Sequence, residues 1–309
     1  MAMEDWTPLE IDPEGIGGPE ELVERLEAMG QDELTALLTE EKAVVFRDFD
    51  ITADTLDDIL GLVLPNRFHR ARRCDRIAGD SRIARDDRPH ALVPPHHEMS
   101  CNHAWPTRLA LHCRTAPTTG GATVVVDGAR WLAALDPEVR ERFAPGVRYV
   151  RHLHDGPGLG DSWQDTFETN RREEVEVFLD GTGDEWCWKP DGGIQVSRIR
   201  PATVAHPVTG AEVWFNQVHR WYPPGQDEDP AGAALARVLP VDAPPRNVTF
   251  TDGSPIPEEY VVQISDRGFA HAVDIPWNRG DLMLLDNVAL AHGRRPFTGH
   301  RCICVAMSD

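Results

Sequence analysis

The segment PPHHEMS, Pro94–Ser100, places the strongest single constraint on the fold of this chain. His96 and Glu98 stand two residues apart, and on a β-strand such residues project from the same face. If the segment is a strand, one imidazole and one carboxylate converge on a point. A second histidine, His292, lies far downstream in LLLDNVALAHGRRPFTGHR. Two histidines and one carboxylate on one face of a metal leave open positions, as in non-haem iron(II) sites.

The neighbouring residues narrow the type of metal site. A zinc site of the HExxH type is excluded, because Cys101 stands where its second histidine would be. His97 points to the other face of a regular strand, so we expect it to pack or to support the ligands.

Arg301 is the second candidate for a binding role. It follows His292 by nine residues and opens RCICVAM, in which Ile303 and Val305 would share its face. A buried arginine needs an anion, and a carboxylate accepts two hydrogen bonds from one guanidinium. We therefore expect Arg301 to bind a small carboxylate; an exposed arginine near a chain end is the alternative.

Charge and composition limit the partners. The 309 residues include 31 Lys and Arg against 51 Asp and Glu, a net charge of -20, which argues against nucleic acid and anionic membranes. No apolar run approaches the roughly 18 residues that span a bilayer, and MAMEDWTPLEID lacks the features of a signal peptide. The six cysteines include no CxxC pair and are expected to be packed thiols. These features predict a cytoplasmic protein with a small-molecule substrate, free or bound to a carrier protein, and leave its oligomeric state open.

Periodicity predicts alternating helices and strands. Helices are expected at residues 19–42 with a break at Gly30, 51–64, 132–143 and 162–181. Strands are expected at 43–49, 94–100, 107–117, 120–131, 147–154, 201–207 and 211–219, and as a pair in 279–307 around a turn at Pro296–Gly299. The arginine-rich segment 67–90 is either a solvated loop or a lid or docking surface for an acidic substrate or partner.

Five segments in order, PPHHEMS, TAPTTGGATVVVD, WKPDGG, VWFNQVH and GDLMLLDNVALAHGRRPFTGHR, resemble the TauD/TfdA family of Fe(II)/2-oxoglutarate-dependent dioxygenases. The likeness is greatest to the syringomycin-type amino-acid hydroxylases of natural-product pathways. It implies an α+β fold with a mainly β core, a double-stranded β-helix or jelly roll with flanking helices and a long insertion. It also implies one domain over residues 1–309, with an insertion-containing region at about 130–275. The arginine-rich lid or loop, at about 67–95, is predicted from the charge pattern, and in this segment the chain departs from the more neutral loop of the relatives.

The resemblance implies a role for each candidate site residue. Iron(II) would be held by His96, Glu98 and His292, and the co-substrate 2-oxoglutarate by the Thr123 hydroxyl and Arg301. With O2, such a centre would hydroxylate an unactivated carbon of an amino acid or an amino-acid-derived substrate. Halogenation is disfavoured, because halogenating relatives replace the carboxylate ligand with a small residue.

Two alternatives stay open from the sequence. The same iron centre could desaturate or epoxidise its substrate, or the chain could be a metal-binding jelly roll that binds a small anion without oxidising it. Residues that could touch the substrate are Lys189, Arg198, Asn216 and His219. Asn216 and His219 would lie on opposite faces if WFNQVH is a regular strand.

Overall fold

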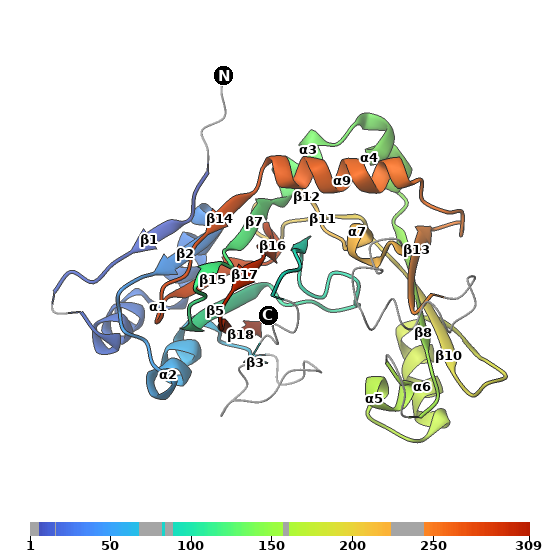
Figure 1. The fold of residues 1–309 in the computed structure, drawn as a ribbon, viewed down its shortest axis with the longest axis horizontal. Coiled ribbons are helices and arrows are strands. Elements are labelled where there is room, and N and C mark those ends of the chain that lie inside the picture. Colours follow the sequence, from blue (N-terminus) through green and yellow to red (C-terminus); the bar gives the residue numbers. More distant parts are fainter. Residues whose placement is uncertain (1–5, 16, 68–81, 84–88, 157–160, 224–243) are drawn as a thin grey trace.

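Two β-sheets face each other and form the core of the molecule (Figure 1). The structure, a computed structural model, describes residues 6–15, 17–67, 82–83, 89–156, 161–223 and 244–309. The larger sheet has six strands in the order β1-β2-β15-β5-β18-β3, and the smaller has four in the order β14-β7-β16-β4. This is the predicted jelly-roll core.

The strands of the two sheets come from both ends of the chain. Those of the six-stranded sheet are β1 (Leu9–Ile11), β2 (Ala43–Phe46), β15 (Leu282–Asp286), β5 (Arg108–Thr115), β18 (Cys302–Ser308) and β3 (Arg82–Ile83). Those of the four-stranded sheet are β14 (Val273–Ile275), β7 (Thr123–Asp127), β16 (Leu290–Arg294) and β4 (Val93–His96). A separate two-stranded sheet consists of β6 (Thr119–Gly120) and β17 (Phe297–Thr298).

Side chains alternate along β15 between two buried layers. Met283 and Leu285 enter the core between the sheets, whereas Leu282 and Leu284 pack on the other side, under α1 (Pro19–Glu41) and α2 (Ala53–Val63). Because both faces of the strand are covered, it reads as a continuous apolar run. Burying each such side chain contributes about 1.5–3 kcal/mol.

Helices also cover the outer face of the four-stranded sheet. Val124 and Val126 of β7 pack there with Trp131 of α3 (Gly128–Ala134) and Ile264 of α9 (Glu258–Ala270). In Figure 1, α3, α4 (Pro137–Phe143) and α9 lie together above this sheet. The inner face of the sheet is thereby left for the site described below.

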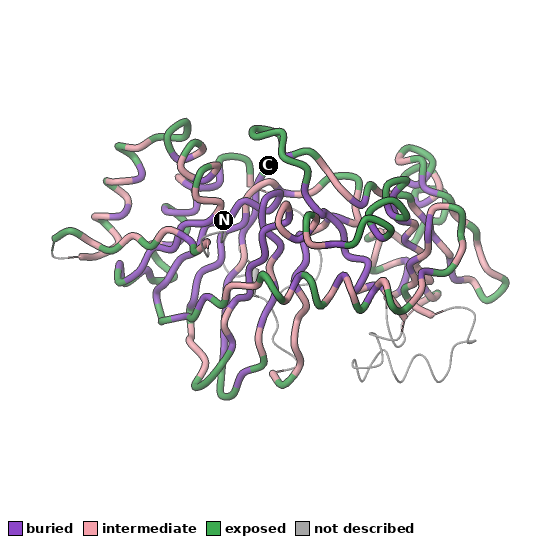
Figure 2. Tube along the Cα trace, turned by 90° about the horizontal axis from the view of Figure 1, so that it is seen from above, coloured by how far each residue is buried: buried purple, intermediate pink, exposed green. Residues whose placement is uncertain are grey.

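A long insertion separates β7 from β14. It carries a second four-stranded sheet, in the order β13-β8-β10-β9, beside α5 and α6 at one end of the molecule (Figure 1). Figure 2 shows that the buried trace runs through the centre of the molecule and that exposed segments lie at its margins. After α3 and α4, the insertion comprises β8 (Val147–Leu153), α5 (Trp163–Phe167), α6 (Arg172–Thr182), β9 (Glu185–Trp188), β10 (Ile194–Arg200), β11 (Thr203–Ala205), β12 (Glu212–Trp214), α7 (Val218–Trp221) and β13 (Arg246–Phe250), and it ends with α9.

Two expected elements are interrupted or shortened in the structure. The helix expected at 162–181 is two helices, because Glu168 adopts a left-handed conformation with φ 54° between α5 and α6. The strand expected at 120–131 stops at Asp127, whose carboxylate accepts hydrogen bonds from the backbone of Ala129 and Arg130 and so caps α3.

The C-terminal prediction was wrong in the number of strands. Four strands, β15 to β18, occupy the segment read as a pair, and the expected turn at Pro296–Gly299 contains β17. Asp286 causes the extra reversal, since its Oδ1 accepts hydrogen bonds from the backbone N–H groups of Val288 and Ala289. Both of these residues are apolar, so hydropathy does not reveal the turn.

Some predictions concern residues that the structure does not describe. Most of the arginine-rich segment 67–90 lies outside the described residues, apart from Arg67, β3 and residues 89–90. The single domain and its insertion boundaries stay predictions. Of the helices in the described ranges, none combines the length and hydropathy needed to cross a membrane.

Candidate metal centre

Two neighbouring strands bring the two histidines together. His292 of β16 lies directly opposite His96 of β4, and their ring centroids are 4.6 Å apart. Paired residues on antiparallel strands share a face of the sheet, so both rings point toward the inside of the jelly roll. β4 is an edge strand, which is where Pro94 and Pro95 can be tolerated, since they donate no backbone hydrogen bonds.

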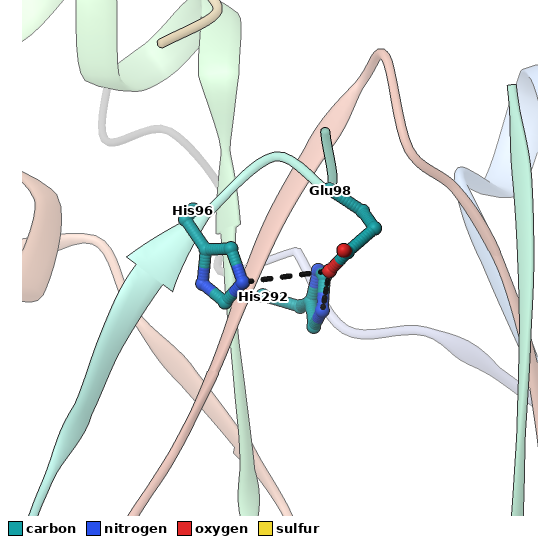
Figure 3. Close-up of side chains that lie close together, drawn as sticks. All are labelled: His96, Glu98 and His292. Carbon is teal, nitrogen blue, oxygen red and sulfur yellow. Dashed lines mark ion pairs between the residues drawn. The ribbon is translucent and has the colours of Figure 1, made fainter. Parts of the chain in front are cut away.

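Glu98 reaches the histidines from a turn (Figure 3). Its Oε2 lies 3.6 Å from Nε2 of His96 and 3.8 Å from Nε2 of His292. One ligand atom from each residue lies within 4.8 Å of the others. The expectation that Glu98 would share a strand face with His96 was wrong, because β4 ends at His96. The turn includes Met99, whose φ of 58° is unfavourable for a residue with a side chain.

Asn287 fixes the backbone of Glu98. Its Oδ1 accepts a hydrogen bond of 2.7 Å from the Glu98 N–H, and its Nδ2 donates to the carbonyls of Glu98 at 3.1 Å and of Pro106 at 2.7 Å. The Asn287 side chain is completely buried. It therefore restrains the strained turn from both sides of the Glu98 peptide. Asn287 was not predicted to belong to the site, because no spacing in the sequence signals its role.

The two other histidines near the centre support the backbone. His97 is fully buried, its ring packs 4.7 Å from that of Phe215, and its Nδ1 lies 2.7 Å from the Asn287 carbonyl. His219 Nε2 lies 2.7 Å from the Pro95 carbonyl. Burial lowers the pKa of His97 and of His219 to about 4.

The electrostatics leave the candidate ligands in the forms that bind metals. Burial lowers the pKa of His96, and burial followed by the effect of His96 lowers that of His292 to about 3, while Glu98 acts in the opposite direction. Both rings are therefore neutral at physiological pH. His96 Nδ1 donates to the Pro94 carbonyl at 3.0 Å, which leaves the Nε2 lone pair facing Glu98. Two imidazole nitrogens and one carboxylate oxygen suit iron(II).

Thr123 and Arg301 are the two residues predicted to bind the co-substrate. Thr123 of β7 is two residues from Val125, which pairs with His292, so its hydroxyl shares the inner face of the sheet. Trp277 Nε1 donates to Thr123 Oγ1 at 2.9 Å, which leaves the hydroxyl hydrogen of Thr123 available to a ligand. Arg301 is buried, and its Nε donates to the Gly121 carbonyl at 3.0 Å. Thr123 therefore offers a hydrogen-bond donor on the face of the sheet that carries His292, and Arg301 is fixed beside the turn that leads to Thr123.

The candidates for substrate contact take different places. Arg198 lines a cavity of about 230 Å³ that Glu98 also lines. Lys189, Asn216 and His219 are not among the described residues that line it. Asn216 is buried and donates to the Ala202 carbonyl at 2.8 Å. The strand interpretation of WFNQVH was wrong, because β12 ends at Trp214 and His219 lies in α7.

Several residues that line the cavity were not predicted from the sequence. Tyr149 and Arg151 of β8, together with Gln217 and Arg220 at α7, face the same cavity as Glu98. The spacing of Tyr149 and Arg151 puts them on one face of a strand. The sequence does not show which face of the insertion looks toward the metal centre.

Comparison with known proteins places the chain in a family context. The family model described as "Taurine catabolism dioxygenase TauD, TfdA family" matches residues 6–307. The dapdiamide synthesis protein DdaC of Enterobacter agglomerans is 30% identical over 278 residues, covering 88% of this chain and 84% of that protein. A clavaminate synthase-like protein of Arabidopsis thaliana is 31% identical over 288 residues, covering 89% and 83% of the two chains. Among solved structures, a taurine dioxygenase from Burkholderia xenovorans shares the fold with a TM-score of 0.54 at 15% identity, over 98% of this chain and 86% of that one.

Proposed function

Because the chain belongs to the TauD/TfdA family of Fe(II)/2-oxoglutarate-dependent dioxygenases, we propose that it hydroxylates a small amino acid or amino-acid-derived substrate in specialised metabolism. The substrate would be free or attached to a carrier protein. A relative named for dapdiamide synthesis supports the biosynthetic setting, since it is alignable over most of both chains.

One observation carries the proposal: His96, Glu98 and His292 form a three-ligand cluster with two neutral imidazoles and one carboxylate. Iron(II) bound there with 2-oxoglutarate would supply oxygen activation coupled to the conversion of 2-oxoglutarate to succinate and carbon dioxide. The retained carboxylate of Glu98 favours oxygenation over halogenation, because halogenating relatives have a small residue in its place.

The chain's own residues would orient the co-substrate. Arg301 would pair with the distal carboxylate of 2-oxoglutarate, and its burial would strengthen that charge-assisted hydrogen bond. Thr123 would donate its hydroxyl hydrogen to the same acid, since Trp277 occupies the oxygen as a donor. His97, His219 and Asn287 would keep the ligand-bearing backbone fixed while the substrate enters from the cavity beside Glu98.

The decisive experiment is anaerobic addition of Fe(II) and 2-oxoglutarate to the purified protein. We expect a visible metal-to-ligand charge-transfer band, weakened in Glu98→Ala and His292→Ala and retained in the control His271→Ala, because His271 is exposed and outside the cluster. Absence of the band in wild-type protein loaded with both components would contradict the proposal. With oxygen and substrate, product structure by mass spectrometry and NMR separates hydroxylation from desaturation and epoxidation.

A further inference from the structure

Four arginines line the cavity beside Glu98. They are Arg151, Arg198, Arg220 and Arg246, and Glu98 is the one carboxylate among the described lining residues. Such a concentration of positive charge is unexpected in a chain with a net charge of -20.

Three of these arginines come from one face of the insertion sheet. Arg246 of β13 pairs directly with Arg151 of β8, and Arg198 of β10 pairs with Tyr149, two residues from Arg151. Directly paired residues share a face, so the three guanidinium groups emerge on the same side. Like charges placed opposite each other on adjacent strands destabilise a sheet, and a carboxylate placed between them offsets that cost.

Two aspartates hold the arginines in position. Asp161 Oδ2 lies 2.8 Å from Nη2 of Arg151 and 3.6 Å from Nη2 of Arg246. Asp184 Oδ2 lies 2.9 Å from Nη2 of Arg198. Neither aspartate is among the residues that line the cavity. Each carboxylate therefore restrains a guanidinium group whose residue still borders the cavity.

The fourth arginine lies on another element, close to the metal centre. Arg220, in α7, is the strongest charged influence on His96, whose pKa it lowers after burial has done so. Burial raises the pKa of the Cys101 thiol, which also lines the cavity, and all four guanidinium groups act against that rise. The arginines of the insertion sheet and Arg220 of α7 therefore all act on groups that line the same cavity.

Resting on the proposed function, we propose that the substrate is an acidic amino acid, or a derivative that keeps its side-chain carboxylate, and that Arg151 and Arg198 bind that carboxylate. Arg220 faces the substrate from the side of the metal centre. Guanidinium groups match carboxylates in a planar, two-bond geometry, which gives the cavity its selectivity for an acid over the corresponding amide. A volume of about 230 Å³ suits a molecule of amino-acid size.

The test compares acids with their amides in the complete anaerobic complex with Fe(II) and 2-oxoglutarate. Calorimetry at fixed ionic strength would measure binding of L-aspartate against L-asparagine and of L-glutamate against L-glutamine. We expect at least one acid to bind at least tenfold more tightly than its amide. Arg151→Gln and Arg198→Gln should each raise the Kd of that acid at least tenfold, and Arg198→Lys, which keeps the charge but loses the planar fork, should have an intermediate effect.

Arg148→Gln is the matched control. Arg148 lies on β8 like Arg151 but on the opposite face, where it bonds to Glu185 and Ser197, so the variant makes the same change of charge on the same strand. Its Kd for the acid should stay within twofold of the wild-type value. Amides binding as tightly as acids, no binding by either acid, or equal losses in Arg148→Gln and Arg151→Gln would each overturn the proposal.

The two proposals fail in different ways. If the charge-transfer band and slow succinate formation without added substrate are present in wild-type and Arg148→Gln proteins, the oxygenase function stands whatever the acids do. If acids are not preferred under those conditions, only the assignment of an acidic substrate is wrong.

Discussion

At the scale of single residues, buried neutral side chains support the backbone that carries the candidate metal ligands. The ring of His219 packs 5.5 Å from that of Trp131, and its Nε2 must donate to the Pro95 carbonyl, which can only accept. Its Nδ1 is buried without a hydrogen-bond partner among the described residues. Protonation of that nitrogen would bury a charge without a hydrogen-bond partner. His219 contacts Pro95, the residue before His96, so the charge would lie close to a candidate ligand. The neutral form of His219 is therefore required.

This requirement predicts a pH dependence of stability. The pKa of His219 is lowered by burial to about 4 in the folded protein, below the ordinary value of 6.5, so between these values only the unfolded chain binds the extra proton. Above pH 6.5 the neutral His219 does not lower the free energy of unfolding. As the pH falls from 6.5 toward 4, proton binding to the unfolded chain lowers that free energy progressively. The slope approaches about 1.4 kcal/mol per pH unit for one group.

His219→Gln keeps a donor for Pro95 and removes the titration. Urea denaturation of the metal-free protein between pH 4.5 and 6 should give a shallower slope of unfolding free energy for this variant, by about 1.4 kcal/mol per pH unit. The exposed His271→Gln should keep the wild-type slope. Equal slopes in wild-type protein and His219→Gln would show that His219 does not titrate in this way.

At the scale of elements, short turns decide where the site residues point. Gly120 and Gly121 both have positive φ values, 67° and 69°, in the connection that leads into Thr123. A Cβ on Gly121 would lie 2.8 Å from Pro117 Cγ, 3.0 Å from Phe297 Cβ and 3.1 Å from Arg301 Cδ. The turn therefore sets the place of Arg301 as well as that of its own strand.

We predict that Gly121→Ala raises the KM for 2-oxoglutarate at least tenfold, because Arg301 must move to make room for the methyl group. Gly210→Ala is its control, since Gly210 has a nearly identical φ of 68° with nothing within 4 Å of its would-be Cβ. Denaturation should show a loss of about 1–2 kcal/mol in Gly210→Ala from the left-handed conformation alone, and a larger loss in Gly121→Ala, whose methyl group also makes close contacts. Only Gly121→Ala should lose affinity for the co-substrate. An unchanged KM in Gly121→Ala would rule out this positioning role.

The elements also show which predictions the sequence supports. The segments that form β5, β15 and much of β18 were predicted to be strands, and the structure buries most of their side chains. The turn made by Asp286 and the left-handed break at Glu168 were missed, since each depends on local hydrogen bonding or backbone conformation that leaves no hydropathy signal. For the same reason the sequence grouped His96 with Glu98 on the assumption that both lie on one strand, whereas β4 ends at His96 and Glu98 lies in a turn.

At the scale of the whole molecule, the jelly roll supplies the candidate metal ligands and the insertion supplies most of the walls of the cavity. The family motifs made the first part predictable from the sequence. The second part was not, apart from Arg198, because the cavity depends on how the sheet β13-β8-β10-β9 faces the core, and no local pattern encodes that packing.

A metal bound between β4, β16 and the Glu98 turn should stabilise the whole fold. At a free Fe(II) concentration of about 100 times Kd, binding adds about 2.7 kcal/mol to the free energy of unfolding. Anaerobic thermal denaturation should therefore show a higher Tm with Fe(II), reversed by a chelator and absent in His292→Ala. An equal rise in Tm in His292→Ala would place the stabilising metal elsewhere.

The hydrogen bond from the Glu98 N–H to the Asn287 side chain joins residues 189 positions apart in the chain. Contacts of such long sequence separation are slow to form, because a large loop must close before they stabilise anything. During synthesis on a ribosome, His96 and Glu98 emerge long before Asn287 and His292. Iron held by His96, Glu98 and His292 would therefore be acquired only after the last core strands have been made and have folded back onto the first, so loading with iron would follow folding rather than guide it.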